Sequence, residues 1–165
     1  MNLEKLLTSE DDLVFTVELE EQMDRFLDAA TAPELCIGIV GERFPLLANL
    51  SVLENVALQS MYQANKSVAW VRNRVAPYIE QLALEEAMGK RRADLSEEEL
   101  FNVLLLRCLA VRCRAVLLVQ PEPWNCGSTY NFVKGIDADI RLWICCFRDE
   151  AAKYASLHLR QIAIE

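Results

Sequence analysis

The pattern of apolar and polar residues predicts short buried strands that alternate with amphipathic helices. Strands are predicted where apolar and β-branched residues cluster, at 13–17, 34–40, 115–119, 141–147 and 161–164. Helices are predicted at 18–30, 66–88, 96–114, 128–133 and 150–159. The run 115–119 is apolar at every position, which is typical of a strand buried on both faces of a parallel sheet. This alternation predicts an α/β domain of three layers.

Two capping boxes predict where two of the helices begin. Ser51 is followed three residues later by Glu54, and Ser96 in the same way by Glu99. In such a box the serine oxygen accepts a first-turn N–H, and the glutamate accepts the N–H of the serine. The helix that follows Ser96 is apolar on nearly all sides from 100 to 111, which predicts a helix enclosed by protein. Pro77 predicts a kink or a break within 66–88.

The length of the chain predicts the number of domains, and its charge argues against one class of partner. A chain of 165 residues is the size of one compact domain, so we expect residues 1–165 to form a single domain. The net charge of −8 argues against nucleic-acid binding, and residues 1–30 alone hold nine acidic and two basic side chains. No apolar run reaches 18 residues, and the N-terminus lacks the order of a signal peptide, so we expect a cytoplasmic location.

Six cysteines lie mostly inside apolar runs. They form no C-x-x-C pair, and His158 is the one histidine that could join them as a metal ligand. Reduced thiols in the core are therefore expected, with no metal site.

Two segments resemble the ATP-binding subunit of ABC transporters. Residues 49–56 are similar to the Asn-Leu-Thr-Val-x-Glu-Asn-Val run that follows the Q-loop in that family. Residues 94–118 are similar to the family's signature, the helix after it and the Walker B strand. The resemblance covers about residues 13–165 and implies a P-loop-NTPase-like α/β/α fold with a mostly parallel sheet. Because only 22 positions separate Val14 from Cys36, the family's antiparallel β-subdomain is expected to be missing.

The phosphate-binding residues of the family are replaced in this chain. Residues 14–22 fall where the resemblance places the Walker A loop, and they contain neither glycine nor lysine. Glu20 falls on the position of the phosphate-binding lysine, and Glu21 on that of the magnesium-binding serine. No G-x-x-x-x-G-K-[ST] occurs anywhere in the chain. Two like charges 4 Å apart repel by about 4 kcal/mol at an effective dielectric of about 20, so a carboxylate at the lysine position opposes phosphate binding.

The other catalytic motifs change as well. Val119 and Gln120 fall on the Walker B Asp and the Glu after it, and no histidine follows the strand 141–147 where the H-loop would lie. Glu42 takes the place of the Q-loop glutamine. The serine of the family's signature is kept as Ser96, whereas the two glycines of the signature are replaced by negatively charged residues, Glu97 and Glu98. The resemblance thus implies a pseudo-ATPase without catalytic residues, cofactor or metal.

The segment after the Q-loop position implies a docking surface. In the family this region receives a coupling helix of the membrane subunit, and the matching candidates are Glu42, Phe44, Leu46, Leu47, Asn49 and Leu50. The resemblance therefore implies a binding or regulatory subunit of an ABC-type transport system, held at the membrane only through a partner. That partner would be an ABC permease or an active ABC ATPase homologue, and a homodimer is a further possibility.

Two alternatives stay open. An unrelated small enzyme could use Cys126, His158 or the acidic N-terminal face. A decayed domain could instead have kept no partner at all. The sequence offers no nucleophile and base at a supporting spacing, so the binding subunit is preferred.

Overall fold

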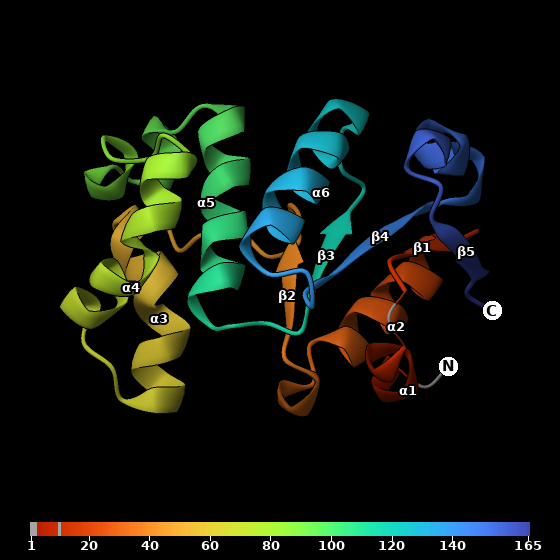
Figure 1. The fold of residues 1–165 in the computed structure, drawn as a ribbon, viewed down its shortest axis with the longest axis horizontal. Helices are drawn as coiled ribbons and strands as arrows, with labels where there is room; N and C mark the ends of the chain where they lie inside the picture. The colour runs from red at the N-terminus through yellow and green to blue at the C-terminus, as the bar shows by residue number, and fades with distance from the viewer. Residues whose placement is uncertain (1–2, 10) are drawn as a thin grey trace. The chain divides into compact units, whose positions relative to one another are not determined.

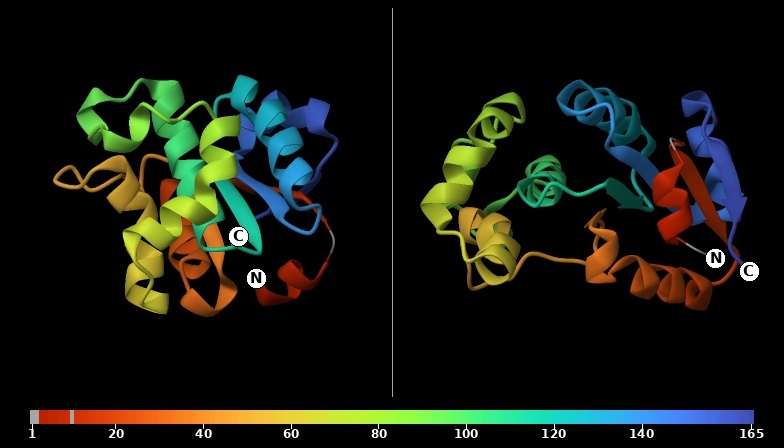
Figure 2. Two further views of the ribbon diagram at one scale, coloured as in Figure 1. Left: turned by 60° about the vertical axis from the view of Figure 1, so that its left-hand side comes forward. Right: turned by 60° about the horizontal axis from the view of Figure 1, so that its bottom comes forward.

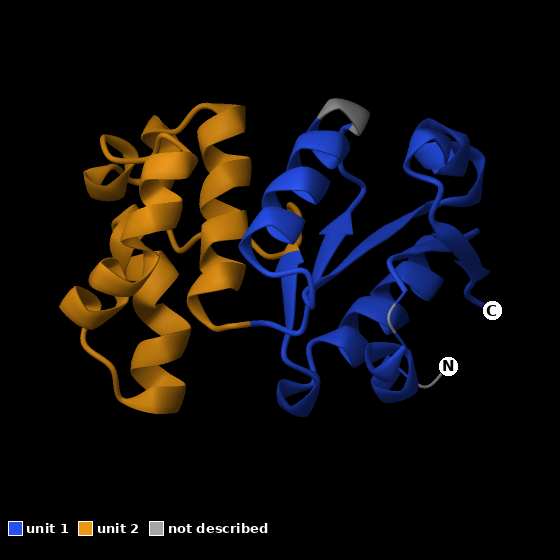
Figure 3. Ribbon diagram, in the orientation of Figure 1, with its two compact units in different colours: residues 1–39, 113–165 blue, residues 40–112 orange. Residues whose placement is uncertain are grey.

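The computed structural model describes residues 3–9 and 11–165, and the side chains of all of these except residues 123 and 124. The chain divides into two compact units (Figure 3). Unit 1 comprises residues 1–39 and 113–165, and unit 2 comprises residues 40–112. The single domain expected from the length stays a prediction.

A five-stranded sheet forms the centre of unit 1 (Figure 1). Its strands lie in the order β2-β3-β4-β1-β5. Their bounds are β1 Leu13–Val17, β2 Ile37–Val40, β3 Ala115–Val119, β4 Arg141–Phe147 and β5 Arg160–Ala163. The strand β1 pairs in parallel with β4 and β5, and β3 pairs in parallel with β4. The predicted α/β fold with a mostly parallel sheet is therefore confirmed.

Helical segments cover both faces of this sheet (Figures 1 and 2). One face carries α1 (Leu3–Thr8), α2 (Glu20–Ala30) and the 3-10 turn η1 (Pro33–Leu35). The other face carries α6 (Pro123–Ile136) and the 3-10 segment η4 (Arg148–Leu157). Between β1 and β2 the described chain contains α2 and η1 and no strand.

Aromatic packing anchors β1 in the core of unit 1. All five residues of β1 are buried, and the ring of Phe15 lies 4.7 Å from that of Phe26 on α2. On β4, the ring of Trp143 meets Phe15 edge-on at 5.3 Å and is fully buried. Edge-on and tilted ring pairs add to the free energy of burial, so β1 is held firmly between α2 and β4.

Unit 2 is helical. It comprises α3 (Val52–Ala64), α4 (Val68–Gln81), α5 (Glu97–Ala110) and the 3-10 turns η2 (Ala87–Gly89) and η3 (Arg92–Asp94). Both predicted capping boxes are confirmed, because Ser51 Oγ accepts the Glu54 N–H at 3.3 Å and Ser96 Oγ accepts the Glu99 N–H at 3.1 Å. Half of the residues of α5 are buried, as expected for a helix enclosed by protein.

Several predicted helix limits were wrong. The helix after Ser96 ends at Ala110 rather than at residue 114, because Arg112 adopts a left-handed backbone with φ 53°. The predicted helix 66–88 ends at Gln81, and Ala83 is also left-handed. Pro77 lies inside α4 without breaking it. These stops depend on single backbone conformations that periodicity does not detect.

Unit 1 also differs from the prediction in three places. The helix expected at 128–133 begins at Pro123 and runs to Ile136. The helix expected at 150–159 is a 3-10 segment that starts directly after β4. The strand expected at 34–40 is shortened to Ile37–Val40, because a proline-initiated 3-10 turn occupies its beginning.

Candidate functional site

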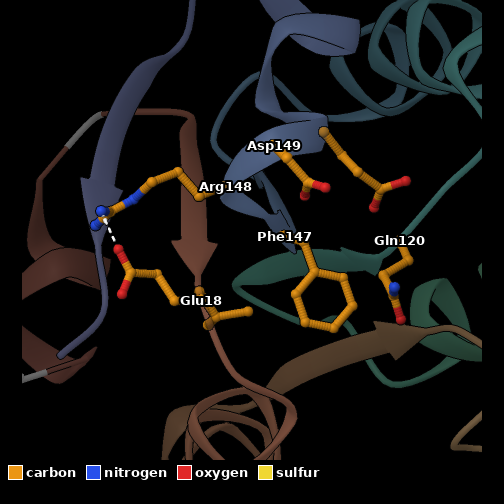
Figure 4. A pocket seen from close by; sticks show the side chains of 7 residues that line it. Glu18, Gln120, Phe147, Arg148 and Asp149 are labelled. Atoms are coloured by element: carbon orange, nitrogen blue, oxygen red, sulfur yellow. Dashed lines mark hydrogen bonds and ion pairs between the residues drawn. The ribbon is translucent and has the colours of Figure 1, made fainter.

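A pocket lies at the carboxyl ends of β1, β3 and β4 in unit 1 (Figure 4). Ligands of open parallel sheets bind at this edge, so it is the place to look for a site. The pocket has a volume of about 710 Å³. It is lined by Val17, Glu18, Gln120, Phe147, Arg148, Asp149 and Glu150.

Carboxylates dominate the charge of this pocket. The guanidinium of Arg148 turns toward Glu18 and forms an ion pair with it, whereas Asp149, Phe147 and Gln120 lie on the other side of the view (Figure 4). Glu150 is paired with a lysine one turn later, at 2.5 Å. The one arginine of the lining is thus already engaged by a carboxylate, which leaves little positive charge for an anionic ligand.

The turn between β1 and α2 is very short. Only Glu18 and Leu19 separate the end of β1 from the first residue of α2. The side-chain oxygen of Gln22 accepts the N–H of Glu18 at 2.8 Å and the N–H of Leu19 at 3.0 Å. Free N–H groups before a helix are what an anion would bind, and here a side chain of the protein occupies two of them. The sequence analysis missed this role of Gln22, although a glutamine in the first turn of a helix is a known capping residue.

Glu20 and Glu21 begin α2 and are exposed. Together with Leu19 and Asp24 they line a second hollow of about 410 Å³. Carboxylates in the first turn suit the positive end of the helix dipole, so their position stabilises α2 itself.

The two Walker B positions lie at the end of β3, and Gln120 lines the pocket. Val119 is the last residue of β3 and is 8% exposed, and its side chain has no oxygen that could bind a metal. Gln120 is exposed in a left-handed conformation with φ 46°, and its N–H donates to the Cys145 oxygen at 2.8 Å. The pocket thus gathers Gln120 with Glu18 and Asp149, two carboxylates that the sequence analysis did not select.

The signature positions lie in unit 2 and form the N-cap and the first turn of α5. Ser96 is its N-cap, and Glu97 and Glu98 are exposed in its first turn. Glu99 accepts from Lys90 at 2.7 Å. This hydrogen bond lowers the pKa of the Glu99 carboxyl and raises the pKa of the Lys90 amine. The segment therefore forms a well-capped helix end that carries three exposed or half-exposed carboxylates.

The predicted docking loop, residues 42–50, is exposed in part. Glu42 and Asn49 are exposed, and Leu47 is 48% exposed. Phe44 and Leu50 are half-buried. The candidate Leu46 is an exception, because at 3% exposure its side chain packs inside the protein and offers nothing to a partner.

Two side chains of unit 2 hold the backbone of the docking loop. The oxygen of Asn55 accepts the Leu47 N–H at 2.7 Å, and its amide group donates to the Leu47 oxygen at 3.1 Å. Arg107 on α5 donates to the Phe44 oxygen at 2.8 Å and to the Pro45 oxygen at 3.3 Å. Burial lowers the pKa of the Arg107 guanidinium. The backbone of the loop is therefore held at residues 44, 45 and 47 by one buried and one half-buried side chain.

The residues of the alternative enzyme offer little chemistry. Cys126 is 2% exposed, and burial raises the pKa of its thiol to about 12, so the thiol stays protonated near neutral pH. His158 is exposed in a left-handed conformation at the end of η4, rather than inside a helix. Five of the six cysteines are buried and Cys36 is half-buried, as predicted for core residues.

The described residues hold neither a cluster of metal ligands nor a helix that could span a membrane. Among residues 3–9 and 11–165, no three histidine, cysteine or acidic side chains are grouped so that they could hold a metal ion. Over the same residues, no helix has both the length and the apolar character needed to cross a membrane.

Comparisons with known proteins point to one class. No family model matches the chain. It is 29% identical over 85 residues to the uncharacterized ABC transporter ATP-binding protein y4fO of Sinorhizobium fredii, a match that covers 52% of this chain and 25% of the relative. It is 26% identical over 118 residues to the methionine import ATP-binding protein MetN 1 of Pseudomonas fluorescens, covering 69% of this chain and 35% of the relative.

A solved structure shares the fold. A bacterial ABC transporter cassette, solved as a dimer, superimposes with a TM-score of 0.69 at 17% identity, covering 95% of this chain and 82% of that one. The matches to the curated relatives span only a quarter to about a third of their length. Sequence similarity and fold together indicate that this chain is related to the ATP-binding domain of ABC transporters.

Proposed function

We propose that this chain is a catalytically inactive ABC ATPase-like protein that acts as a binding or regulatory subunit of an ABC-type transport system. The observation that carries the proposal is the two-residue turn between β1 and α2, whose backbone amides are occupied by Gln22. The relatives support the transport context, since both are named as ABC or import ATP-binding proteins.

The short turn argues against a nucleotide for a geometric reason. A phosphate-binding loop is an eight-position motif whose backbone amides surround the phosphates before the helix begins. A turn of two residues is too short to surround a phosphate group. Exposed carboxylates at Glu20 and Glu21 would then meet the phosphates with like charge.

The end of β3 argues against hydrolysis for a chemical reason. Phosphoryl transfer needs a metal ligand and a group that positions the attacking water. Val119 has no oxygen that could bind the metal, and the amide of Gln120 can orient a water but cannot take up its proton as a carboxylate does. The residues at these positions therefore support neither the binding of a nucleotide nor its hydrolysis.

The docking loop supports a binding role. Its backbone is held by Asn55 and Arg107, while Glu42, Leu47 and Asn49 remain exposed. A rigid loop loses little conformational entropy when a partner binds, so such a surface is suited to recognition. We propose that it contacts an ABC permease or an active ABC ATPase homologue on the cytoplasmic side of the membrane.

Calorimetric titration with Mg-ATP tests the loss of nucleotide binding. We expect no saturable heat up to about 1 mM nucleotide, a concentration at which a binding free energy of about −4 kcal/mol would still be detected. The methionine import ATP-binding protein serves as the positive control. Saturable binding of Mg-ATP, reversed by EDTA, would overturn the inactive assignment.

Copurification with a co-expressed permease tests the docking surface. We expect Leu47→Ala together with Asn49→Ala to abolish recovery of the permease. The matched control is Met61→Ala, which truncates another exposed apolar side chain of unit 2 outside the loop. Equal recovery by all three proteins would contradict the proposed surface.

A further inference from the structure

Exposed apolar side chains gather where α3 ends and α4 begins, and we call residues 61–70 the α3–α4 corner (Figure 1). Five large apolar side chains are exposed among the described residues, and three of them lie in this corner: Met61 at 39%, Tyr62 at 84% and Trp70 at 42%. Apart from the half-buried Val68, every residue of the corner is exposed. Single exposed apolar residues are normal, whereas a cluster of them marks a surface that binds a partner or a membrane.

Hydrogen bonds fix the backbone of the α3–α4 corner. Asn65 ends α3 in a left-handed conformation with φ 49°, and the next N–H, that of Lys66, donates back to the Ser60 oxygen at 3.2 Å. Ser67 then caps α4, since its Oγ accepts the Trp70 N–H at 3.1 Å. The corner therefore holds its exposed side chains on a rigid turn, which loses little conformational entropy on binding.

Two cations flank the indole of Trp70. Lys66 Nζ lies 5.0 Å from the centroid of the ring, and Arg74 Cζ lies 5.5 Å from it. Within residues 3–9 and 11–165, no carboxylate forms an ion pair with either cation. Burial and the nearby charge of Arg112 lower the pKa of Arg74, so a further positive charge lies close by. The indole is thus surrounded by positive charge that no carboxylate of the described chain neutralises by direct contact.

The acidity of the whole chain does not extend to this stretch of sequence. Residues 55–79 contain three basic side chains and no Asp or Glu, in a chain of net charge −8. The carboxylates of α3 and α4 nearest in sequence are Glu54, about 12 Å along the helix from Tyr62, and Glu80, about 15 Å from Trp70. Both distances exceed the Debye length of about 8 Å at physiological salt, so a surface that meets the corner interacts mainly with its cations.

We propose that the α3–α4 corner binds the surface of an anionic phospholipid membrane directly. Tryptophan and tyrosine rings favour the headgroup level of a bilayer, and lysine and arginine beside them are attracted to anionic headgroups. An exposed corner fits a deformable lipid surface, whereas a rigid protein partner would need a matching cavity. This contact acts besides one through a protein partner, and it depends neither on the docking loop nor on the loss of nucleotide binding.

Cosedimentation of the full chain with lipid vesicles tests the proposal. We expect binding at about 50 mM NaCl to phosphatidylcholine vesicles that contain about 30% phosphatidylglycerol, release at about 500 mM NaCl, and no binding to pure phosphatidylcholine. Each basic side chain beside an anionic surface strengthens binding about fivefold, so Lys66→Glu should weaken it at least about tenfold. Tyr62→Ala with Trp70→Ala should weaken it at least about fivefold through lost apolar burial, with unchanged far-UV circular dichroism.

Two control variants separate the corner from net charge and from the docking loop. Arg25→Glu reverses an exposed charge on α2 in unit 1 and should bind vesicles like the unmodified protein. If it weakens binding as much as Lys66→Glu does, net charge governs binding and the proposal fails. Leu47→Ala with Asn49→Ala should also leave vesicle binding unchanged. Copurification of the permease in detergent involves no bilayer, so Met61→Ala remains a neutral control there, and the two proposals can fail separately.

Quenching by brominated phospholipids shows whether Trp70 itself reaches the lipid. Trp143 is fully buried, so bound unmodified protein should lose emission through Trp70. Trp70→Phe keeps an aromatic ring at the position and should still bind the vesicles, but without this quenching. Equal quenching in Trp70→Phe would contradict the proposal, and so would equal binding to neutral vesicles or no binding to anionic ones. Corner variants that lose the permease but keep full vesicle binding would assign the corner to a protein partner and also overturn it.

Discussion

Replacing Asn55 by alanine should loosen the docking loop. Asn55 is 4% exposed, and its side chain contacts the backbone of the loop and of the turn before α3. Besides the two bonds to Leu47, its amide group donates to the Ser51 oxygen at 3.0 Å, with a longer contact to the Leu50 oxygen at 3.4 Å. A single buried side chain thus joins two positions of the loop, Leu47 and Leu50, to the N-cap Ser51.

The size of the effect follows from these bonds. The amide group has two hydrogens, so Asn55 makes about three effective hydrogen bonds, including the one that its oxygen accepts. Each contributes about 0.5–1.5 kcal/mol net, and water can reach part of the loop in the variant. We expect Asn55→Ala to lower the free energy of unfolding by about 2–3 kcal/mol, which corresponds to a Tm lower by roughly 5–10 °C.

Urea and thermal unfolding followed by circular dichroism measure this change. The matched control is Asn49→Ala, because Asn49 is exposed on the same loop and should leave stability within about 0.5 kcal/mol of the unmodified protein. The two variants therefore separate the group that holds the loop from the group that we assign to the partner. A loss below about 0.5 kcal/mol for Asn55→Ala would refute the reasoning that this side chain fixes the loop.

Three further predictions concern other parts of the chain. Gln22→Ala removes the acceptor of two amides before α2, so it should lower the free energy of unfolding by about 1 kcal/mol in urea without producing a calorimetric response to Mg-ATP. Capping hydrogen bonds with Ser51 lower the pKa of the Glu54 carboxyl, and the hydrogen bond from Lys90 lowers the pKa of the Glu99 carboxyl. The stability that these two carboxylates contribute is therefore complete above about pH 4.5 and is lost as the pH falls below it. In the variant with both Glu54→Gln and Glu99→Gln, the urea midpoint should change less with pH over that acidic range. The same pH dependence of the midpoint as in the unmodified protein would contradict this. Burial raises the pKa of Cys126 to about 12 and that of Cys146 to about 11, so intact-mass measurement should find both unmodified by iodoacetamide at about pH 8 in the folded chain and alkylated in urea.

The sequence by itself determined the parts that depend on local chemistry. The strands 115–119 and 141–147 were predicted with their observed limits, because β-branched and apolar runs bounded by polar residues leave little choice of structure. The starts of α3 and α5 followed from Ser51 and Ser96, since a capping box is completed within four residues. The absence of a phosphate-binding motif was equally visible, because that motif is continuous along the chain.

The tertiary structure decided what depends on distant residues or on single backbone torsions. Gln120 and Asp149 lie 29 positions apart in the sequence and line one pocket only because the carboxyl ends of parallel strands meet at one edge of the sheet. The end of α5 depended on the left-handed backbone of Arg112, which apolar periodicity does not report. Arg74 lies beside the ring of Trp70 and is fixed to the end of α5, an arrangement that the sequence alone did not predict, because burial and charge at a surface are set jointly by neighbouring elements.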